Sequence, residues 1–166
     1  FAANGDCPKL QASIGSNKAQ LLNTYNSTFA PLYKTLEANS YGSMQYFGKP
    51  YYWIADAQLM CDYIYSQVWN VRGTYDPLMR TQCEYLLAFD LFSEFSTDAI
   101  RSVYLYHILT TMRDSLQAKV DGKTDDLKML FLSGHDSNVV AFLSLFRKDN
   151  NICLAREFAR KYSPSK

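Results

Sequence analysis

The spacing of apolar residues constrains this chain most: along most of the sequence they recur every three or four positions, as in amphipathic helices. The pattern predicts a helix over residues 18–38, which Pro31 kinks or breaks. It resumes over 51–69, over 77–92, and over 98–120 after a run of capping side chains. Most of the chain is therefore expected to be helical.

Length and charge limit the kinds of protein that fit. The chain has 166 residues, of which 48 % are hydrophobic and 20 % charged, so one globular domain is expected. A net charge of +1 leaves no broad basic surface for a nucleic acid. The longest apolar runs, 129–132 and 139–143, are far shorter than the roughly 20 residues that cross a bilayer. Neither a nucleic-acid partner nor a membrane span is expected.

Aromatic residues make up 15 % of the sequence and are dense over residues 51–69. Aromatic side chains at helical spacing are usually part of a core. Because large amphipathic rings also suit contact surfaces, the same helix is a candidate face for a homodimer.

Four cysteines are present, and no two are spaced as Cys-x-x-Cys, the usual start of a zinc or redox site. Cys61 and Cys83 lie eleven residues before and after Arg72, the centre of a predicted helical hairpin. Antiparallel helices would bring these two cysteines side by side, which predicts a disulfide; the alternative is two small buried apolar residues. Cys7 and Cys153 would then pair with each other or with cysteines elsewhere.

Two further features suggest a processed, secretory protein. The triplet Asn26-Ser27-Thr28 is the one sequon in the chain, which makes Asn26 a candidate for glycosylation. The chain begins with Phe1 rather than Met and has no leader-like segment nearby, so we expect it to be processed or truncated.

The character of the sequence changes after residue 126. Residues 128–133 form a short, continuous apolar run that predicts a buried strand, and Gly134 ends it before helical patterning returns over 137–146. The expected fold class is therefore α/β, and the lone strand would need neighbouring strands to satisfy its backbone groups. The basic residues of 156–166 predict a solvated tail.

His135 and Asp136 stand where the predicted strand meets the predicted helix. Ligands of open α/β sheets bind at such junctions, where a helix N-terminus favours anions such as phosphate. A protonated His135 would pair with a phosphate oxygen, and a protonated Asp136 would give its proton to a leaving group. The alternative is that Asp136 only caps the helix while His135 packs at the turn.

The segment Leu132-Ser-Gly-His-Asp-Ser-Asn-Val-Val-Ala-Phe-Leu143 resembles the second signature of the histidine acid phosphatases. Asp6-Cys7-Pro8-Lys9 is similar to the segment that opens the helical cap of animal members of that family. The resemblance implies a histidine phosphatase-like α/β fold. It divides the chain into a helical cap-like region (1–126), a strand-turn-helix unit (127–155) and the basic tail (156–166), and it makes 51–69 a wall of the cap.

The family hydrolyses phosphomonoesters at acidic pH through a phosphohistidine, without metal or cofactor, in secreted or lysosomal compartments. By resemblance, His135 is a phosphate ligand and Asp136 is the general acid. The family's nucleophile lies in an Arg-His-Gly motif, which this sequence lacks, and its other histidine, His107, has the setting of an ordinary helix residue. The chain alone is therefore expected to be inactive.

Two explanations follow from the missing nucleophile. In the first, the N-terminal portion of the same protein or a second chain supplies the nucleophile and the phosphate-binding arginines. In the second, the chain is a non-catalytic phosphatase-like module for binding or interaction. No motif of serine hydrolases, nucleotide-binding proteins or zinc proteases is present.

Overall fold

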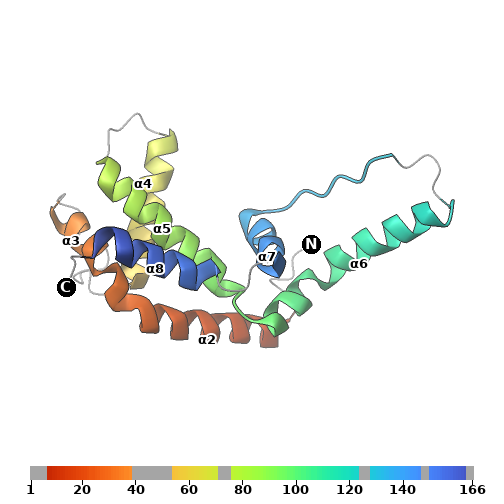
Figure 1. The fold of residues 1–166 in the computed structure, drawn as a ribbon, viewed down its shortest axis with the longest axis horizontal. Coiled ribbons are helices and arrows are strands. Elements are labelled where there is room, and N and C mark those ends of the chain that lie inside the picture. Colours follow the sequence, from red (N-terminus) through yellow and green to blue (C-terminus); the bar gives the residue numbers. More distant parts are fainter. Residues whose placement is uncertain (1–6, 39–53, 71–75, 124–127, 147–149, 164–166) are drawn as a thin grey trace.

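The computed structural model describes residues 7–38, 54–70, 76–123, 128–146 and 150–163, and every regular element within them is helical (Figure 1). The elements are α2 (Pro8–Tyr25), the 3₁₀ turn η1 (Asn26–Phe29), α3 (Ala30–Ala38), α4 (Ile54–Asn70), α5 (Pro77–Glu94), α6 (Asp98–Val120), α7 (Asp136–Phe146) and α8 (Asn150–Tyr162). None of these helices is long and apolar enough to cross a membrane.

The α/β fold class predicted from the sequence is wrong for the described residues, which form an all-α structure. Residues 128–133 are an extended segment with exposed side chains, and Phe131 is 77 % exposed. Because a strand is stabilised only by pairing with another strand, and the described ranges offer no second one, this apolar run forms no ladder. Figure 1 shows it running back from the far end of α6 to α7.

Local signals explain where several helices begin. Pro31 lies in the first turn of α3, directly after η1, so the predicted break in residues 18–38 is realised as a 3₁₀ turn. Asp76 caps α5 by accepting a hydrogen bond from the Leu78 amide, and Pro77 takes the first helical position. Thr97 caps α6 in the same way, through the Ile100 amide.

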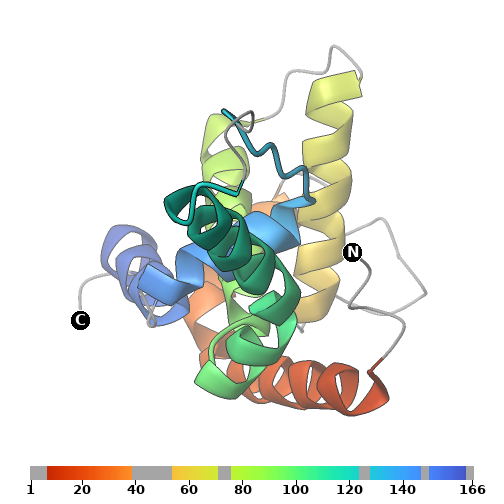
Figure 2. The ribbon, with the colours of Figure 1, turned by 90° about the vertical axis from the view of Figure 1, so that its right-hand side faces the viewer.

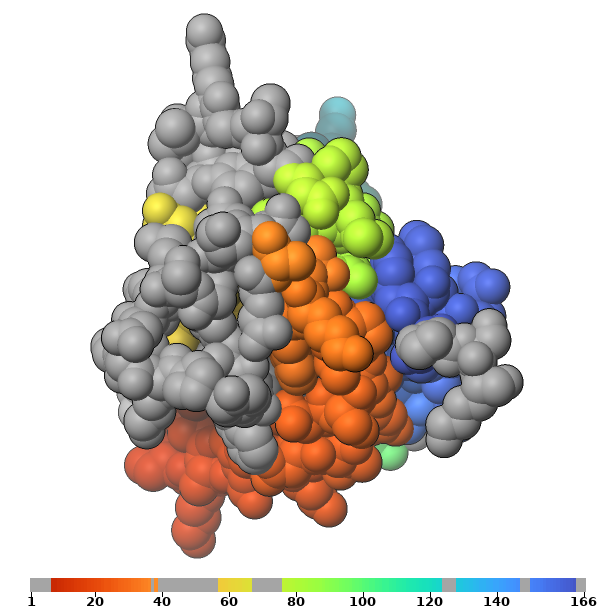
Figure 3. Space-filling model, turned by 90° about the vertical axis from the view of Figure 1, so that its left-hand side faces the viewer, coloured from red at the N-terminus to blue at the C-terminus, as the bar shows by residue number. Residues whose placement is uncertain are grey.

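The main core lies where α5 packs against α2, α4 and α8. Three fully buried rings meet at its centre: the Phe29 ring centroid is 5.2 Å from that of Phe89 and 4.6 Å from that of Phe158. On the face away from α6, α3 lies beside the start of α5 and near α8 (Figure 3).

Residues 156–162, which the sequence assigned to a solvated tail, belong to α8 and contribute to this core. Within α8, Phe158 is fully buried and Ala155 is 1 % exposed, whereas Arg156 and Arg160 are exposed. The basic side chains therefore occupy one face of an amphipathic helix whose other face packs on α5. The helix continues from Arg156 to Tyr162, across the boundary that the sequence predicted at residue 156.

A second, smaller core joins α6 and α7 to the N-terminal half of α2. Its buried members are Leu10, Ile14, Phe95, Ile100, Leu105 and Ala141. Beyond it α6 projects away from the body, as Figures 1 and 2 show, and we call α6, residues 128–135 and α7 together the arm. The candidate site lies on this arm.

The predicted disulfide is confirmed. Cys61 of α4 and Cys83 of α5 are bonded, with their Cα atoms 5.1 Å apart, and both side chains are fully buried. The two cysteines lie at the same level of the antiparallel helices α4 and α5, as their equal distance in sequence from the predicted turn indicated.

Replacing both Cys61 and Cys83 by Ala is expected to lower the free energy of unfolding by about 3 kcal/mol, because the unfolded chain regains the freedom of a 22-residue loop. Urea denaturation of the oxidised protein measures the change. Cys153→Ala, which removes a half-buried thiol outside the disulfide, is the control. A double variant as stable as wild type would contradict the cross-link.

Candidate functional site

The turn that carries the predicted site begins α7. The His135 carbonyl accepts hydrogen bonds from the amides of Asn138 (3.0 Å) and Val139 (3.2 Å), which close the first turn of the helix. Asp136 Oδ1 accepts a hydrogen bond from the Ser137 amide at 2.7 Å. His135 and Asp136 are both exposed, so the structure places the two predicted residues next to each other and open to solvent.

Gly134 lies where an added side chain would crowd Asn138. A Cβ atom at this position would lie 3.0 Å from the Asn138 Cβ and 3.3 Å from its side-chain Nδ2. Such approaches are tighter than nine in ten real Cβ contacts, so the Asn138 side chain would have to shift by a few tenths of an ångström to admit a larger residue. The small residue before His135 thus has a steric reason.

The four arginines with ion pairs in the described residues bind acids of their own helices. Arg80 pairs with Glu84, Arg101 with Asp98, Arg113 with Asp114, and Arg160 with Glu157. None of these pairs includes His135 or Asp136, so they do not form a phosphate clamp at the start of α7. Within the residues that the structure describes, no cluster of His, Cys, Asp or Glu is arranged to hold a metal ion.

Other residues singled out in the sequence lie away from this turn. His107 is exposed on α6 and its ring stands edge-on to that of Tyr106. Asn26 begins η1, where its Oδ1 accepts a hydrogen bond from the Tyr33 hydroxyl at 2.9 Å, and its glycosylation stays a prediction. Cys7 and Cys153 are not bonded to each other, so the first of the two alternatives for these cysteines is not formed, and pairing with cysteines elsewhere stays a prediction.

The aromatic helix predicted over 51–69 is described only in part. Its first residues, 51–53, lie outside the described ranges, and α4 begins at Ile54. Ala57, Met60, Cys61 and Ile64 face the main core. The described part of this helix is therefore a core element.

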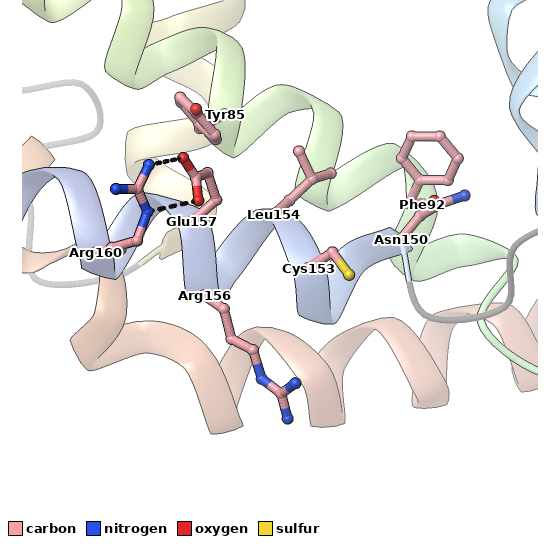
Figure 4. Close-up of a pocket in the computed structure, with 8 residues that line it drawn as sticks. All are labelled: Tyr85, Phe92, Asn150, Cys153, Leu154, Arg156, Glu157 and Arg160. Atoms are coloured by element: carbon pink, nitrogen blue, oxygen red, sulfur yellow. Dashed lines mark hydrogen bonds and ion pairs between the residues drawn. The ribbon is translucent and has the colours of Figure 1, made fainter.

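One hollow that the sequence did not predict lies between α5 and α8 and has a volume of about 560 Å³. Its lining residues are Tyr85, Phe92, Asn150, Cys153, Leu154, Arg156, Glu157 and Arg160. Figure 4 shows Arg160 held by the Glu157 carboxylate, while Arg156 points away from Tyr85. The guanidinium groups of Arg156 and Arg160 point in different directions, so they do not form a clamp for an anion in this hollow.

A second hollow, of about 530 Å³, lies on the arm between α6 and the extended segment. Its lining residues are Met112, Ser115, Leu116, Lys119, Lys128, Met129, Leu130 and Leu132. Two apolar side chains of α7 are also exposed, Val139 by 54 % and Phe146 by 76 %. We call the lining of this hollow and these two side chains together the apolar face of the arm, and the extended segment that contributes to it is followed in sequence by His135.

A partly buried charge network inside the body was also missed, because Lys18 lies more than 70 residues before the two acids that it binds. Lys18 Nζ of α2 lies 2.8 Å from Asp90 Oδ2 and 2.9 Å from Glu94 Oε1, both on α5. Gln58 of α4 donates to the same Asp90 oxygen at 2.7 Å. The Asp90 side chain is 5 % exposed, and its Oδ1 has no hydrogen-bond partner within the described protein.

This network gives a pH prediction. Burial raises the pKa of the Asp90 carboxyl above its usual value, although the hydrogen bond and charge of Lys18 oppose the rise. An acid whose pKa is higher in the folded state contributes stability below its unfolded pKa of 3.8 and loses it as pH rises through the folded pKa. Relative to wild type, Asp90→Asn should therefore become progressively more stable as pH rises from 4 towards neutral.

Urea denaturation at a series of pH values measures that difference. Glu84→Gln, which removes a half-exposed carboxylate paired with Arg80 on the same helix, is the control and should show little such slope. A stability difference between Asp90→Asn and wild type that does not change with pH would contradict the assignment.

No family model, curated protein or solved structure matches this chain.

Proposed function

We propose that this chain is part of a histidine acid phosphatase that hydrolyses phosphomonoesters at acidic pH through a phosphohistidine. The observation that carries the proposal is the exposed pair His135 and Asp136 at the start of α7. An imidazolium beside a carboxyl group at a helix N-terminus offers both a cation for a phosphoryl oxygen and a proton for a leaving group.

The reaction divides between this chain and a complementing portion. A histidine nitrogen of the complementing portion attacks phosphorus, and the ester P–O bond breaks as the N–P bond forms. His135 donates a hydrogen bond to a phosphoryl oxygen, and Asp136 gives its proton to the leaving alkoxide. Water then cleaves the phosphohistidine, and the Asp136 carboxylate takes a proton from that water. These steps use side chains only and call for no metal or cofactor.

The complementing portion is the N-terminal portion of the same protein or a second chain. The chemistry requires it, because four arginines of the described residues are paired with acids of their own helices and do not reach His135 or Asp136. The apolar face of the arm supports it, because exposed apolar patches of this kind mark interaction surfaces. The extended segment of that face runs on to His135, so a polypeptide packed along the segment would lie beside the site.

An acidic secretory compartment, either extracellular or lysosomal, suits this proposal. The disulfide between α4 and α5 is of a kind that forms in oxidising compartments. The proposed reaction uses a hydrogen-bond donor at His135 and a proton donor at Asp136, in keeping with a phosphatase that works at acidic pH.

Isolation of the native polypeptide tests the proposal. An antibody raised against this chain would capture it from its source, and the captured material would be assayed with an aryl phosphate at acidic pH, then reduced for intact mass and N-terminal sequencing. We expect phosphatase activity together with an Arg-His-Gly motif, either in a polypeptide well above 19.0 kDa or in a chain that copurifies. A native 19.0 kDa chain with neither activity nor such a companion would overturn the proposal.

The second candidate is a non-catalytic module that binds phosphate esters or a protein partner. The exposed apolar face of the arm favours it equally, because an interaction module also needs such a surface. Sedimentation of the isolated chain separates the two, since strong homodimer formation would cover the face without any catalytic partner.

A further inference from the structure

The start of α7 is held from the side by α6. The Tyr104 hydroxyl donates a hydrogen bond to Ser137 Oγ, and the two oxygens are 3.3 Å apart. Both side chains are half-buried, and 33 residues separate them in sequence. Ser137 directly follows Asp136, the proposed general acid. The hydrogen bond therefore connects α6 to the residue next to that acid.

The ring that carries this hydroxyl is itself fixed. Tyr104 packs edge-on against Phe95, with ring centroids 4.8 Å apart, and Phe95 is 1 % exposed in the smaller core. The turn that carries His135 and Asp136 is therefore held against α6 through a ring that is itself packed in the smaller core.

We propose that Tyr104 is a positioning residue, which orients the Asp136 carboxyl through its hydrogen bond to Ser137. The inference rests on the proposed function, because it concerns the acid of that same site. A proton donor must lie within hydrogen-bond reach of the leaving oxygen, and hydrogen bonds that are long in an unliganded site often tighten when substrate binds. Tyr104 itself touches neither the substrate nor the reacting atoms.

Tyr104→Phe in the complemented enzyme removes the hydroxyl and keeps the ring against Phe95. We expect kcat for an alkyl phosphate, whose leaving group needs a proton, to fall about three- to tenfold, the equivalent of one net hydrogen bond. KM for the alkyl phosphate and kcat for an activated aryl phosphate should stay within about twofold, because neither depends on proton donation. A merely structural role would lower both rates together.

Tyr106→Phe is the matched control, because Tyr106 lies two residues further along α6, is 63 % exposed and has no hydrogen bond to α7 among the described residues. Ser137→Ala should reproduce the effect of Tyr104→Phe, and the double variant should be no slower than either single one. If the losses of kcat in the two single variants added up in the double variant, Tyr104 and Ser137 would not act through their shared hydrogen bond, and the inference would be overturned.

Hydrogen exchange separates failure of this inference from failure of the proposed function. In Tyr104→Phe the amides of Asn138 and Val139, which close the first turn of α7, should exchange about three- to tenfold faster, whereas Tyr106→Phe should leave them unchanged. This readout needs no enzymatic activity. Unchanged exchange in Tyr104→Phe would overturn the inference, whereas a wild-type enzyme that lacks phosphatase activity even with its complementing portion would overturn the proposed function.

Discussion

Asp136→Asn is expected to lower kcat of the complemented enzyme for alkyl phosphates by about 10²- to 10⁴-fold, the usual contribution of a general acid. An alkoxide is a poor leaving group and must be protonated as the P–O bond breaks, which an amide does not do. An activated aryl phosphate leaves as a stable anion, so its kcat should change far less. Steady-state kinetics with the two esters at acidic pH measure the difference.

Asp114→Asn is a suitable control for this substitution. Asp114 is an exposed acid on α6 whose partner is the neighbouring Arg113, so its replacement should change neither rate. An equal loss of both esters in Asp136→Asn would reject the role of general acid, because it would point to lost binding or lost structure instead.

Phe158→Ala is expected to lower the free energy of unfolding by about 3–5 kcal/mol, the range for removing a buried aromatic side chain. The Phe158 ring is fully buried and lies 4.6 Å from the Phe29 centroid and 4.9 Å from that of Tyr162. Its loss would leave a cavity where α8 packs on α5. Urea denaturation followed by circular dichroism measures the change.

Arg156→Ala on the exposed face of the same helix is the control and should stay within about 0.5 kcal/mol of wild type. If Phe158→Ala were as stable as Arg156→Ala, α8 would be the solvated tail that its basic residues suggested.

The sequence predicted best what local spacing determines. The helical periodicity predicted α5 and α6, the capping side chains before residue 98 predicted the start of α6, and the symmetric positions of Cys61 and Cys83 predicted their disulfide. The adjacency of His135 and Asp136 at the start of a helix also follows from local sequence.

The sequence failed where the outcome depends on distant partners. A continuous apolar run does not distinguish a strand from another apolar segment, and residues 128–133 find no pairing partner in the described protein. The basic side chains of α8 obscured an apolar stripe that includes Phe158. The pairing of Lys18 with Asp90, and that of Tyr104 with Ser137, joins separate helices and leaves no signal in sequence spacing.

The disulfide between α4 and α5 also changes what a protease can do to this protein. Cys61 and Cys83 enclose the whole connection between the two helices, so a single cut between them leaves both fragments covalently joined. Such a nick would be visible by electrophoresis only after reduction. In a protease-rich compartment the two helices would thus stay in register after cleavage, and the protein would tolerate damage that would separate an uncrosslinked hairpin.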